Sequence, residues 1–286
     1  MMSVQIRAAC FGALWLASVA AVAQATMSAE QRRDEFAKLP WQAGPANAAV
    51  GDKAILAIPS DAKLLPEAHG GRFLELTGNL PQAGHSILVA KNWWAVFSFS
   101  DVGYVKDDEK LDPDELLRGL QSGDAVSNEA RSKRGFPTLT TEGWSVPPHF
   151  DPDTKRLEWG LRLRSQGDAQ STINYTVRVL GRTGYESVTL VSDAESLQRD
   201  VAELKTVLKG FNFNAGERYA EFKPGDHVAE IGLGALVLGG AAAAAAKSGW
   251  FKGLLLALAA GWKLVAAAAV ALVVGIGKFL GRKKSG

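Results

Sequence analysis

The two ends of the chain are almost purely apolar, and the middle has the composition of an ordinary soluble protein. A run such as residues 264–274 has no polar face for water, so it is not typical of an amphipathic element of a soluble domain. The middle is long enough to build a sizeable hydrophobic core. We therefore expect one soluble domain at residues 51–228, preceded by a lead-in over residues 26–50.

Residues 1–25 have the three parts of a secretory signal peptide. Arg7 supplies the positive charge, residues 8–22 form the apolar core, and the sequence up to Ala25 ends in the small-residue pattern that a signal peptidase reads. An uncleaved anchor is the alternative, but the apolar core is short for a membrane span. We expect the mature chain to begin at Thr26 and its domain to be exported.

Residues 229–286 read as a membrane anchor with a basic tail. A helix over the first apolar stretch, residues 231–246, would be about 24 Å long, short of a hydrocarbon core of about 30 Å. The second stretch, residues 253–277, is long enough to span and contains one charge, Lys263. The basic tail favours a single crossing with the tail in the cytoplasm, whereas hydrophobicity alone permits two spans. We expect a C-terminal transmembrane helix or helices.

The middle reads as short strands joined by tight turns, with few helices. Residues 156–165 alternate apolar and polar side chains and are followed by a turn and a return strand, which is typical of a β-hairpin. Asp112 before Pro113 predicts a helix start, and Arg131 falls in the last turn of that helix, where a cation is favourable. Further strands are expected at residues 54–58, 86–90, 93–100 and 185–191, and further helices at residues 67–78 and after Ser192. The pattern favours an α+β fold with an antiparallel sheet and a few helices on one face.

The hairpin presents four arginines as a candidate binding patch. On alternation alone, the inward side chains are Trp159, Leu161, Tyr175 and Val177. The arginines expected to point outward are Arg162, Arg164, Arg178 and Arg182. If the strands pair in register, these make a basic patch beside a bilayer, which can meet anionic lipid or an acidic partner protein. An ordinary solvated sheet face is the alternative.

A second candidate group is a polar cluster made of Asp107, Asp108, His149 and Asp151. Acidic residues gather at 107–115, but Lys110 interrupts the spacing of a calcium loop, and a solvated loop with a helix cap accounts for them. The histidine lies near two prolines in what reads as a polar turn, and the other histidines of the mature chain are scattered. No metal or cofactor is expected.

Composition and motifs exclude several classes of function. The net charge of +2 gives no reason to expect a nucleic-acid partner. The only cysteine, Cys10, lies in the expected signal peptide, so the mature chain has no thiol chemistry. The sequence holds no dinucleotide fingerprint and no nucleophile elbow. We find no catalytic or cofactor-binding set in the sequence.

A set of short motifs in fixed order resembles a known family. The motifs are Gly103-Tyr-Val-Lys-Asp-Asp-Glu-Lys110, Arg131-Ser-Lys-Arg-Gly135, Gly143-Trp144, Pro147-Pro-His-Phe-Asp151, Leu157-Glu-Trp159, Asn174-Tyr175, Leu180-Gly-Arg182 and Tyr219-Ala-Glu-Phe222. Together they resemble the bacterial membrane-anchored proteins of domain-of-unknown-function family 2167. The resemblance implies a bacterial membrane protein and assigns no catalytic residues.

The expected function follows from the anchor and from the lack of a catalytic set. We expect a membrane-tethered, non-enzymatic binding or scaffold module of the bacterial envelope, in the inner (cytoplasmic) membrane with its domain on the periplasmic side. Its expected partners are the bilayer and an envelope protein or anionic lipid. The alternative is a hydrolase-like envelope enzyme whose residues converge only in the folded chain.

Overall fold

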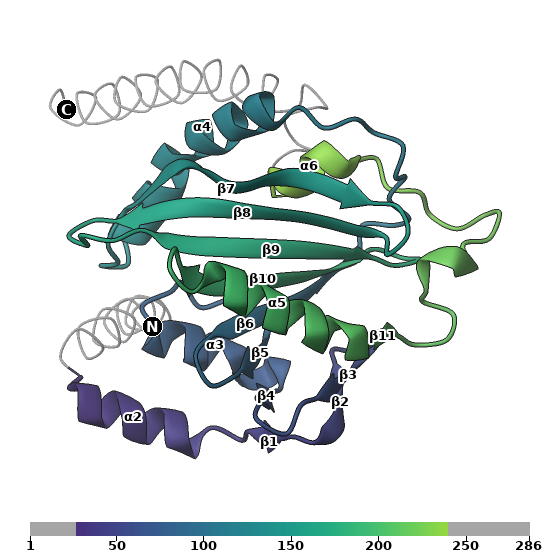
Figure 1. Cartoon of the computed structure of the whole chain (residues 1–286). Coiled ribbons are helices and arrows are strands. Elements are labelled where there is room, and N and C mark those ends of the chain that lie inside the picture. The colour runs from purple at the N-terminus through teal and green to yellow at the C-terminus, as the bar shows by residue number, and fades with distance from the viewer. Residues whose placement is uncertain (1–26, 240–286) are drawn as a thin grey trace, which may run out of the picture. The chain divides into compact units, whose positions relative to one another are not determined.

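An eight-stranded antiparallel sheet is the central element of the computed structural model, which describes residues 27–239 (Figure 1). Its strands in spatial order are β1 (Gln42–Ala43), β4 (Lys63–Leu65), β5 (Ser86–Val89), β6 (Trp94–Ser100), β10 (Tyr185–Asp193), β9 (Thr172–Leu180), β8 (Arg156–Ser165) and β7 (Leu139–Asp151). The predicted α+β class and antiparallel sheet are confirmed.

A second, three-stranded sheet and one helix cover one face of the large sheet. The small sheet has the order β11 (Phe211–Phe213), β3 (Ala54–Ile58) and β2 (Ala46–Val50). Helix α5 (Leu197–Val207) crosses in front of the large sheet in Figure 1 and continues into the 3-10 turn η1 (Leu208–Gly210). Leu56 of β3 and Leu204 of α5 are fully buried against Val177 and Val188. We call this side of the large sheet the α5 face.

The opposite side carries the other helices, and we call it the α3–α4 face. Phe73 of α3 (Glu67–Leu76) packs on Leu65 and Ile87 of the sheet, and α2 (Ala29–Lys38) adds Phe36. Helix α4 (Pro113–Ser132) lies along β7, where the side-chain amide of Asn128 both donates to and accepts from the backbone of Leu139, at 2.7 Å each. The prediction that the helices share one face is wrong, because each face of the sheet carries apolar side chains that need a cover: Val177 and Val188 on the α5 face, and Leu65 and Ile87 beneath α3.

The pairing of β8 with β9 places the hairpin side chains differently from the prediction. Trp159 lies opposite Thr176, and Gly160 lies opposite Tyr175. Residues directly opposite in a ladder share a face, so Trp159 points to the α3–α4 face and Tyr175 to the α5 face. Both are buried, but the prediction that they share a face is wrong. An offset of one residue in the pairing moves a whole set of side chains to the other face.

Strand β7 includes the two prolines that were expected in a polar turn. Pro147 and Pro148 lie within this strand, inside the register shift between Val146 and His149. Proline is tolerated there because β7 is an edge strand and needs no ladder bond on its outer side. His149 and Asp151 are therefore strand residues opposite Glu158 and Arg156, and not turn residues.

The predicted start of helix α4 is confirmed. The carboxylate of Asp112 accepts from the backbone N–H groups of Asp114 and Glu115 at 3.0 Å, as a helix cap should. Pro113 occupies the first helical position, where its missing N–H costs nothing. The cap and the proline together fix where this helix begins.

The predicted start of helix α5 is wrong. Its first residue is Leu197, several residues after the cap expected at Ser192. The hydroxyl of Ser192 donates to the carboxylate of Asp200 at 2.7 Å and so does not cap the helix. The carboxylate of Asp193 instead accepts from the backbone N–H of Ser196 at 2.7 Å. Strand β10 therefore continues through Ser192, and a short turn separates it from the helix.

The described chain stays packed on the rest of the fold as far as Val237. After the 3-10 turn η2 (Tyr219–Glu221), the chain forms a backbone bridge between Val228 and Tyr104 and ends in α6 (Leu233–Val237), whose residues are all buried. No helix within residues 27–239 is long and apolar enough to cross a bilayer. The expected signal peptide and the apolar stretch 253–277 lie outside the described residues. Of the apolar stretch 231–246, only residues 231–239 are described.

Candidate functional site

Helices α3 and α4 leave the middle of the α3–α4 face uncovered, and a cleft of about 430 Å³ opens there. We call it the central cleft. Its floor consists of side chains from the three central strands β6, β10 and β9, namely Trp94, Val96, Ser98, Ser187, Thr189, Val191, Asn174 and Arg178. Its walls come from α3 and the segment after it and from α4, namely Leu74, Asn79, Leu80, Gln82, His85, Ser127 and Arg131.

The floor is polar because of the register of the three strands. Ser98, Ser187 and Arg178 lie opposite one another and form one row across the sheet. In the next row, the hydroxyls of Thr189 and Thr176 are 3.2 Å apart and share a hydrogen bond. Polar side chains at the centre of a large sheet are unusual, since central strands are normally covered by apolar packing. The floor therefore presents hydrogen-bonding groups where a core would be expected.

Arg178 is the most unusual side chain of the cleft. Its guanidinium carbon lies 5.4 Å from the ring centre of Trp159 and 5.0 Å from that of Tyr185, so two aromatic rings hold it in place. Its Nε is buried and has no hydrogen-bond partner within residues 27–239. Burial lowers the pKa of Arg178, although an arginine remains protonated in proteins. The cleft is therefore lined by a positive charge whose buried Nε has no hydrogen-bond partner among the described residues.

A second cation reaches the cleft from α4. Arg131 is only 8% exposed, and its Nε donates to the carbonyl of Pro137 at 2.6 Å. Its guanidinium lies 5.9 Å from the ring centre of Phe136. His85 joins the opposite wall with its Nδ1 2.8 Å from the carbonyl oxygen of Ala83. Of the described residues that line the cleft, none is an aspartate or a glutamate.

A buried carboxyl group lies beneath the floor, on the α5 face. Glu186 is fully buried, and neither of its carboxyl oxygens has a hydrogen-bond partner within the described part of the chain. Burial, with a smaller contribution from Glu67, raises the pKa of Glu186 to about 8. Glu186 is therefore mostly protonated at neutral pH and does not compensate the charge of Arg178.

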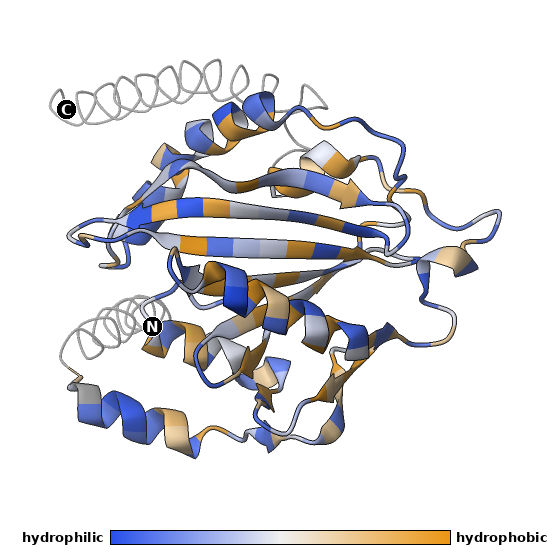
Figure 2. Ribbon diagram, in the orientation of Figure 1, coloured by the Kyte–Doolittle hydropathy of each residue, from blue (hydrophilic) through white to orange (hydrophobic). Residues whose placement is uncertain are grey.

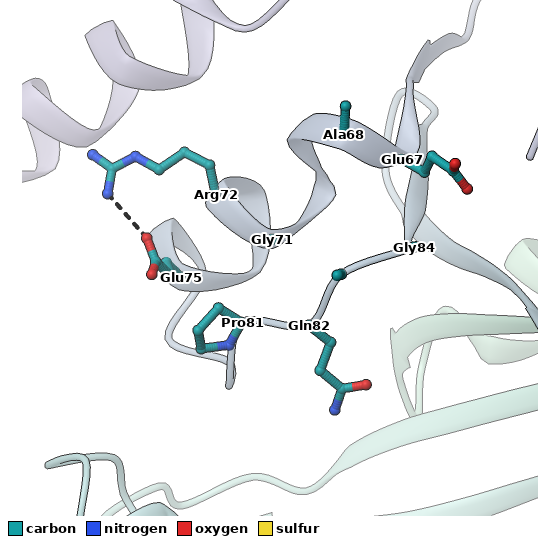
Figure 3. Close-up of a pocket in the computed structure, with 9 residues that line it drawn as sticks. Glu67, Ala68, Gly71, Arg72, Glu75, Pro81, Gln82 and Gly84 are labelled. Atoms are coloured by element: carbon teal, nitrogen blue, oxygen red, sulfur yellow. Dashed lines mark hydrogen bonds and ion pairs between the residues drawn. The ribbon is translucent and has the colours of Figure 1, made fainter.

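A neighbouring hollow of about 450 Å³ beside α3 has a different charge balance (Figure 3). Arg72 on its wall pairs with Glu75 at 3.3 Å, as the dashed line in Figure 3 shows, and with Glu35 at 3.1 Å. Gln82 lines both this hollow and the central cleft. Because its cation is already paired, this hollow has less to offer a charged ligand than the central cleft.

The four arginines of the predicted patch do not gather on one surface. Arg162 and Arg164 are exposed on the α5 face, and Arg164 donates to Glu142 at 2.5 Å. Arg178 lies on the other face. Arg182 sits in the turn after β9 and binds both carboxylate oxygens of Asp226, at 2.7 and 2.6 Å. A single basic patch is therefore not formed, because strand register and an ion pair separate its members.

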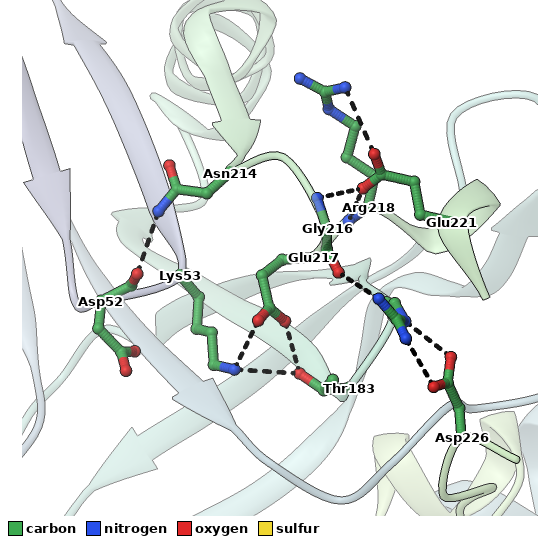
Figure 4. A network of polar contacts seen from close by, with 10 residues as sticks. Asp52, Lys53, Thr183, Asn214, Gly216, Glu217, Arg218, Glu221 and Asp226 are labelled. Atoms are coloured by element: carbon green, nitrogen blue, oxygen red, sulfur yellow. Dashed lines mark hydrogen bonds and ion pairs between the residues drawn. The ribbon is translucent and has the colours of Figure 1, made fainter. Parts of the chain in front are cut away.

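The ion pair of Arg182 belongs to a polar network that ties three loops together (Figure 4). Lys53, in the turn between β2 and β3, pairs with Glu217 at 2.8 Å, and the hydroxyl of Thr183 donates to the same carboxylate at 2.8 Å. Arg182 also donates to the carbonyl of Gly216 at 3.1 Å. The partners of the network are satisfied within it, so we assign it a structural role.

The predicted polar cluster is likewise divided among separate contacts. Asp107 pairs with Lys155 at 2.7 Å, and Asp151, the last residue of β7, accepts from the hydroxyl of Thr154 at 2.7 Å in the turn that follows. His149 lies 3.6 Å from the buried carboxylate of Glu158, and Asp108 is exposed. The described residues contain no group of three histidine, cysteine or acidic side chains that could hold a metal ion.

The cleft residues other than Arg178 were missed by the sequence analysis. Ser98, Ser187 and Thr189 each occupy the polar positions of an alternating strand, which is also the pattern of a solvated sheet face. For Arg131, the sequence pattern indicates only a cation in the last turn of a helix. The available signal was that three strands carry polar side chains on one face, but the sequence does not tell that these strands are neighbours.

Comparisons with known proteins agree with the motif resemblance and add little about function. The family model described as "Protein of unknown function (DUF2167)" matches residues 42–275. None of the curated proteins matches the chain. Among solved structures, cyanobacterial PsbP (CyanoP) from Synechocystis sp. PCC 6803 is similar with a TM-score of 0.36 and 10% identity, covering 62% of this chain and 94% of that one. The Ran-binding protein Mog1p of Saccharomyces cerevisiae gives a TM-score of 0.31 and 10% identity, covering 62% and 99%. Likeness at this level supports no transfer of function.

Proposed function

The chain belongs to the DUF2167 family, and we propose that this member is a binding module that holds a small ligand in the central cleft without converting it. One observation carries the proposal: the middle of the sheet is open to a cleft of about 430 Å³ and floored by polar side chains. That volume lies in the range of about 300–1,000 Å³ that is typical of small-molecule sites. Polar groups at the centre of a sheet are best explained by a ligand that hydrogen-bonds to them.

Binding is favoured over catalysis by the side chains that line the cleft. A serine nucleophile needs a neighbouring base within hydrogen-bond reach. The Nδ1 of His85 is placed against the carbonyl oxygen of Ala83, and none of the described hydrogen bonds joins its ring to Ser98 or Ser187. The described lining residues supply no carboxylate as an alternative base. Within residues 27–239, the lining of the cleft therefore offers no support for the hydrolase alternative.

We further propose that the module is tethered to the bacterial inner membrane and works on its periplasmic side. The support comes from the sequence: the signal-like residues 1–25, the apolar stretch 253–277 and the basic tail after it. Carbonate extraction of native membranes, followed by protease treatment of spheroplasts, tests this. The full chain should stay in the membrane pellet and be digested from outside, whereas a protected or extractable chain would contradict the tether.

The cleft is tested with the full chain in detergent and a library of small polar compounds. Binding is measured by calorimetry, and hydrogen exchange locates the ligand. Ser127→Trp, on the wall formed by α4, should fill the cleft and abolish binding. Ser122→Trp is the matched control, because it lies on the same helix and does not line the cleft. Ligand-induced protection from hydrogen exchange that is confined to β6, β9 and β10 supports the proposal. Chemical conversion of a bound compound, or unchanged binding by Ser127→Trp, would contradict it.

A further inference from the structure

We propose that the ligand of the central cleft is a small organic anion whose carboxylate or phosphate group is bound by Arg178 and Arg131, an inference that rests on the proposed function. Both cations line the same cleft, one from the floor and one from the wall formed by α4. The other described lining residues are apolar or uncharged polar side chains, apart from the imidazole of His85. The cleft therefore carries net positive charge in the absence of a ligand.

The position of Arg178 is suited to anion binding. A guanidinium taken out of water loses hydration, and this cost is normally offset by a carboxylate partner in the protein. Arg178 has aromatic partners on either side, Trp159 and Tyr185, and a buried Nε without a hydrogen-bond partner within residues 27–239. The rings fix the orientation of its planar fork in advance, which lowers the entropy lost when an oxyanion binds.

Neutral donors surround the same point. Ser98 and Ser187 lie in the cross-strand row of Arg178, and Asn174 lies on the same strand two rows away. Hydroxyl and amide groups can donate to the remaining oxygens of an anion, and charge-assisted hydrogen bonds are about twice as strong as neutral ones. The volume of the cleft, about 430 Å³, fits a small molecule.

The test uses the full chain in detergent at constant ionic strength and three probes: succinate, inorganic phosphate and the neutral analogue succinamide. Succinate or phosphate should bind and succinamide should bind at least about tenfold more weakly. Arg178→Gln should weaken binding of the anion by about ten- to a hundredfold. Arg178→Lys should fall between the wild type and Arg178→Gln, because it keeps the charge but loses the planar fork. Arg164→Gln is the matched control on the α5 face and should bind as the wild type does.

Each outcome decides between the two proposals. Succinamide can bind as tightly as the anions and lose its binding in Ser127→Trp, which shows that it occupies the cleft. In that case the cleft does not select its ligand by charge, so the inference is wrong while the proposed function stands. If none of the three probes binds, the inference is overturned, and the compound library then decides the proposed function on its own. If Arg178→Gln does not fold, the comparison of Arg178→Lys with Arg164→Gln decides instead. Equal anion affinity in those two variants would overturn the inference.

Discussion

Arg162 and Arg178 lie on opposite faces of one sheet. In the ladder between β8 and β9, Arg162 lies opposite Ile173 on the α5 face, whereas Arg178 lies opposite Leu157 on the α3–α4 face. The two arginines therefore face different surroundings: Arg162 is exposed, and Arg178 is held between two aromatic rings. This separation allows the two sets of cations to be tested independently.

Reversing the exposed pair, Arg162→Glu with Arg164→Glu, should leave the cleft intact. Exposed substitutions usually change stability by less than about 0.5 kcal/mol, and the pair between Arg164 and Glu142 is at the surface. Succinate affinity should therefore equal that of the wild type. If the exposed arginines bind anionic lipid, flotation with anionic vesicles should be lost in the variant and weakened by salt in the wild type. A change in succinate affinity would show that the two faces are coupled.

The domain should fold when the chain ends after Gly239 but lose stability when it ends at Gly225. The shorter chain lacks Leu233 and Leu236, which are fully buried, and also lacks the backbone bridge to Tyr104. Burying a leucine contributes about 1.5–3 kcal/mol, so losing both removes much of a typical domain stability of about 5–15 kcal/mol. Urea unfolding of the two chains measures the difference. Equal midpoints would mean that α6 adds nothing to the core.

Trp159→Ala should destabilise the domain by about 3–5 kcal/mol, the usual cost of removing a large buried aromatic side chain. Trp159 is 4% exposed and lies beside Arg178. Trp159→Phe keeps a ring there and should cost less. Urea unfolding of the domain that ends after Gly239 gives both values. A loss below about 1 kcal/mol for Trp159→Ala would show that the ring is not part of the core.

Glu186→Gln should change how stability depends on pH. The pKa of Glu186 is raised to about 8 in the folded chain, against 4.5 as its ordinary value. The folded state thus keeps a proton that the unfolded state releases, so wild-type stability falls as pH rises from about 4.5 to about 8 and stays low above that. The glutamine variant does not titrate there. Unfolding curves at pH 5, 6.5 and 8 should show the wild type losing stability relative to the variant, and parallel behaviour would contradict the burial argument.

Asp226→Asn should change how the stability of the domain depends on pH at the acidic end of the range. Arg182 lowers the pKa of Asp226 to about 2, below its ordinary value of 3.8. The stabilisation from this pair is present above pH 3.8 and is lost as the pH falls through 2. Wild type and variant should therefore differ in stability at pH 5 and converge near pH 2. Hydrogen exchange in residues 214–226 should rise in the variant at pH 5, and unchanged exchange would show that the network does not hold this loop.

Local signals in the sequence predicted the elements that depend on neighbouring residues. The alternation in residues 156–165 predicted β8 with its observed bounds, and Asp112 before Pro113 predicted the start of α4. These succeed because a side-chain period and a cap are properties of a few consecutive residues. The sequence does not predict that Pro147 lies in a strand. A strand tolerates proline where it has no neighbouring strand on one side, and that depends on its place in the sheet.

By itself, the sequence determined the α+β class, the antiparallel hairpin and the difference in composition between a mixed polar and apolar middle and apolar ends, because each follows from local pattern and composition. Only the tertiary structure decided which faces of neighbouring strands coincide, and so placed Arg178 beside Trp159 and away from Arg162. A strand sequence defines two faces, but the pairing offset decides which of them meet. The central cleft has the same origin, since it forms where α3 and α4, far apart in the sequence, fail to meet over the strands between them.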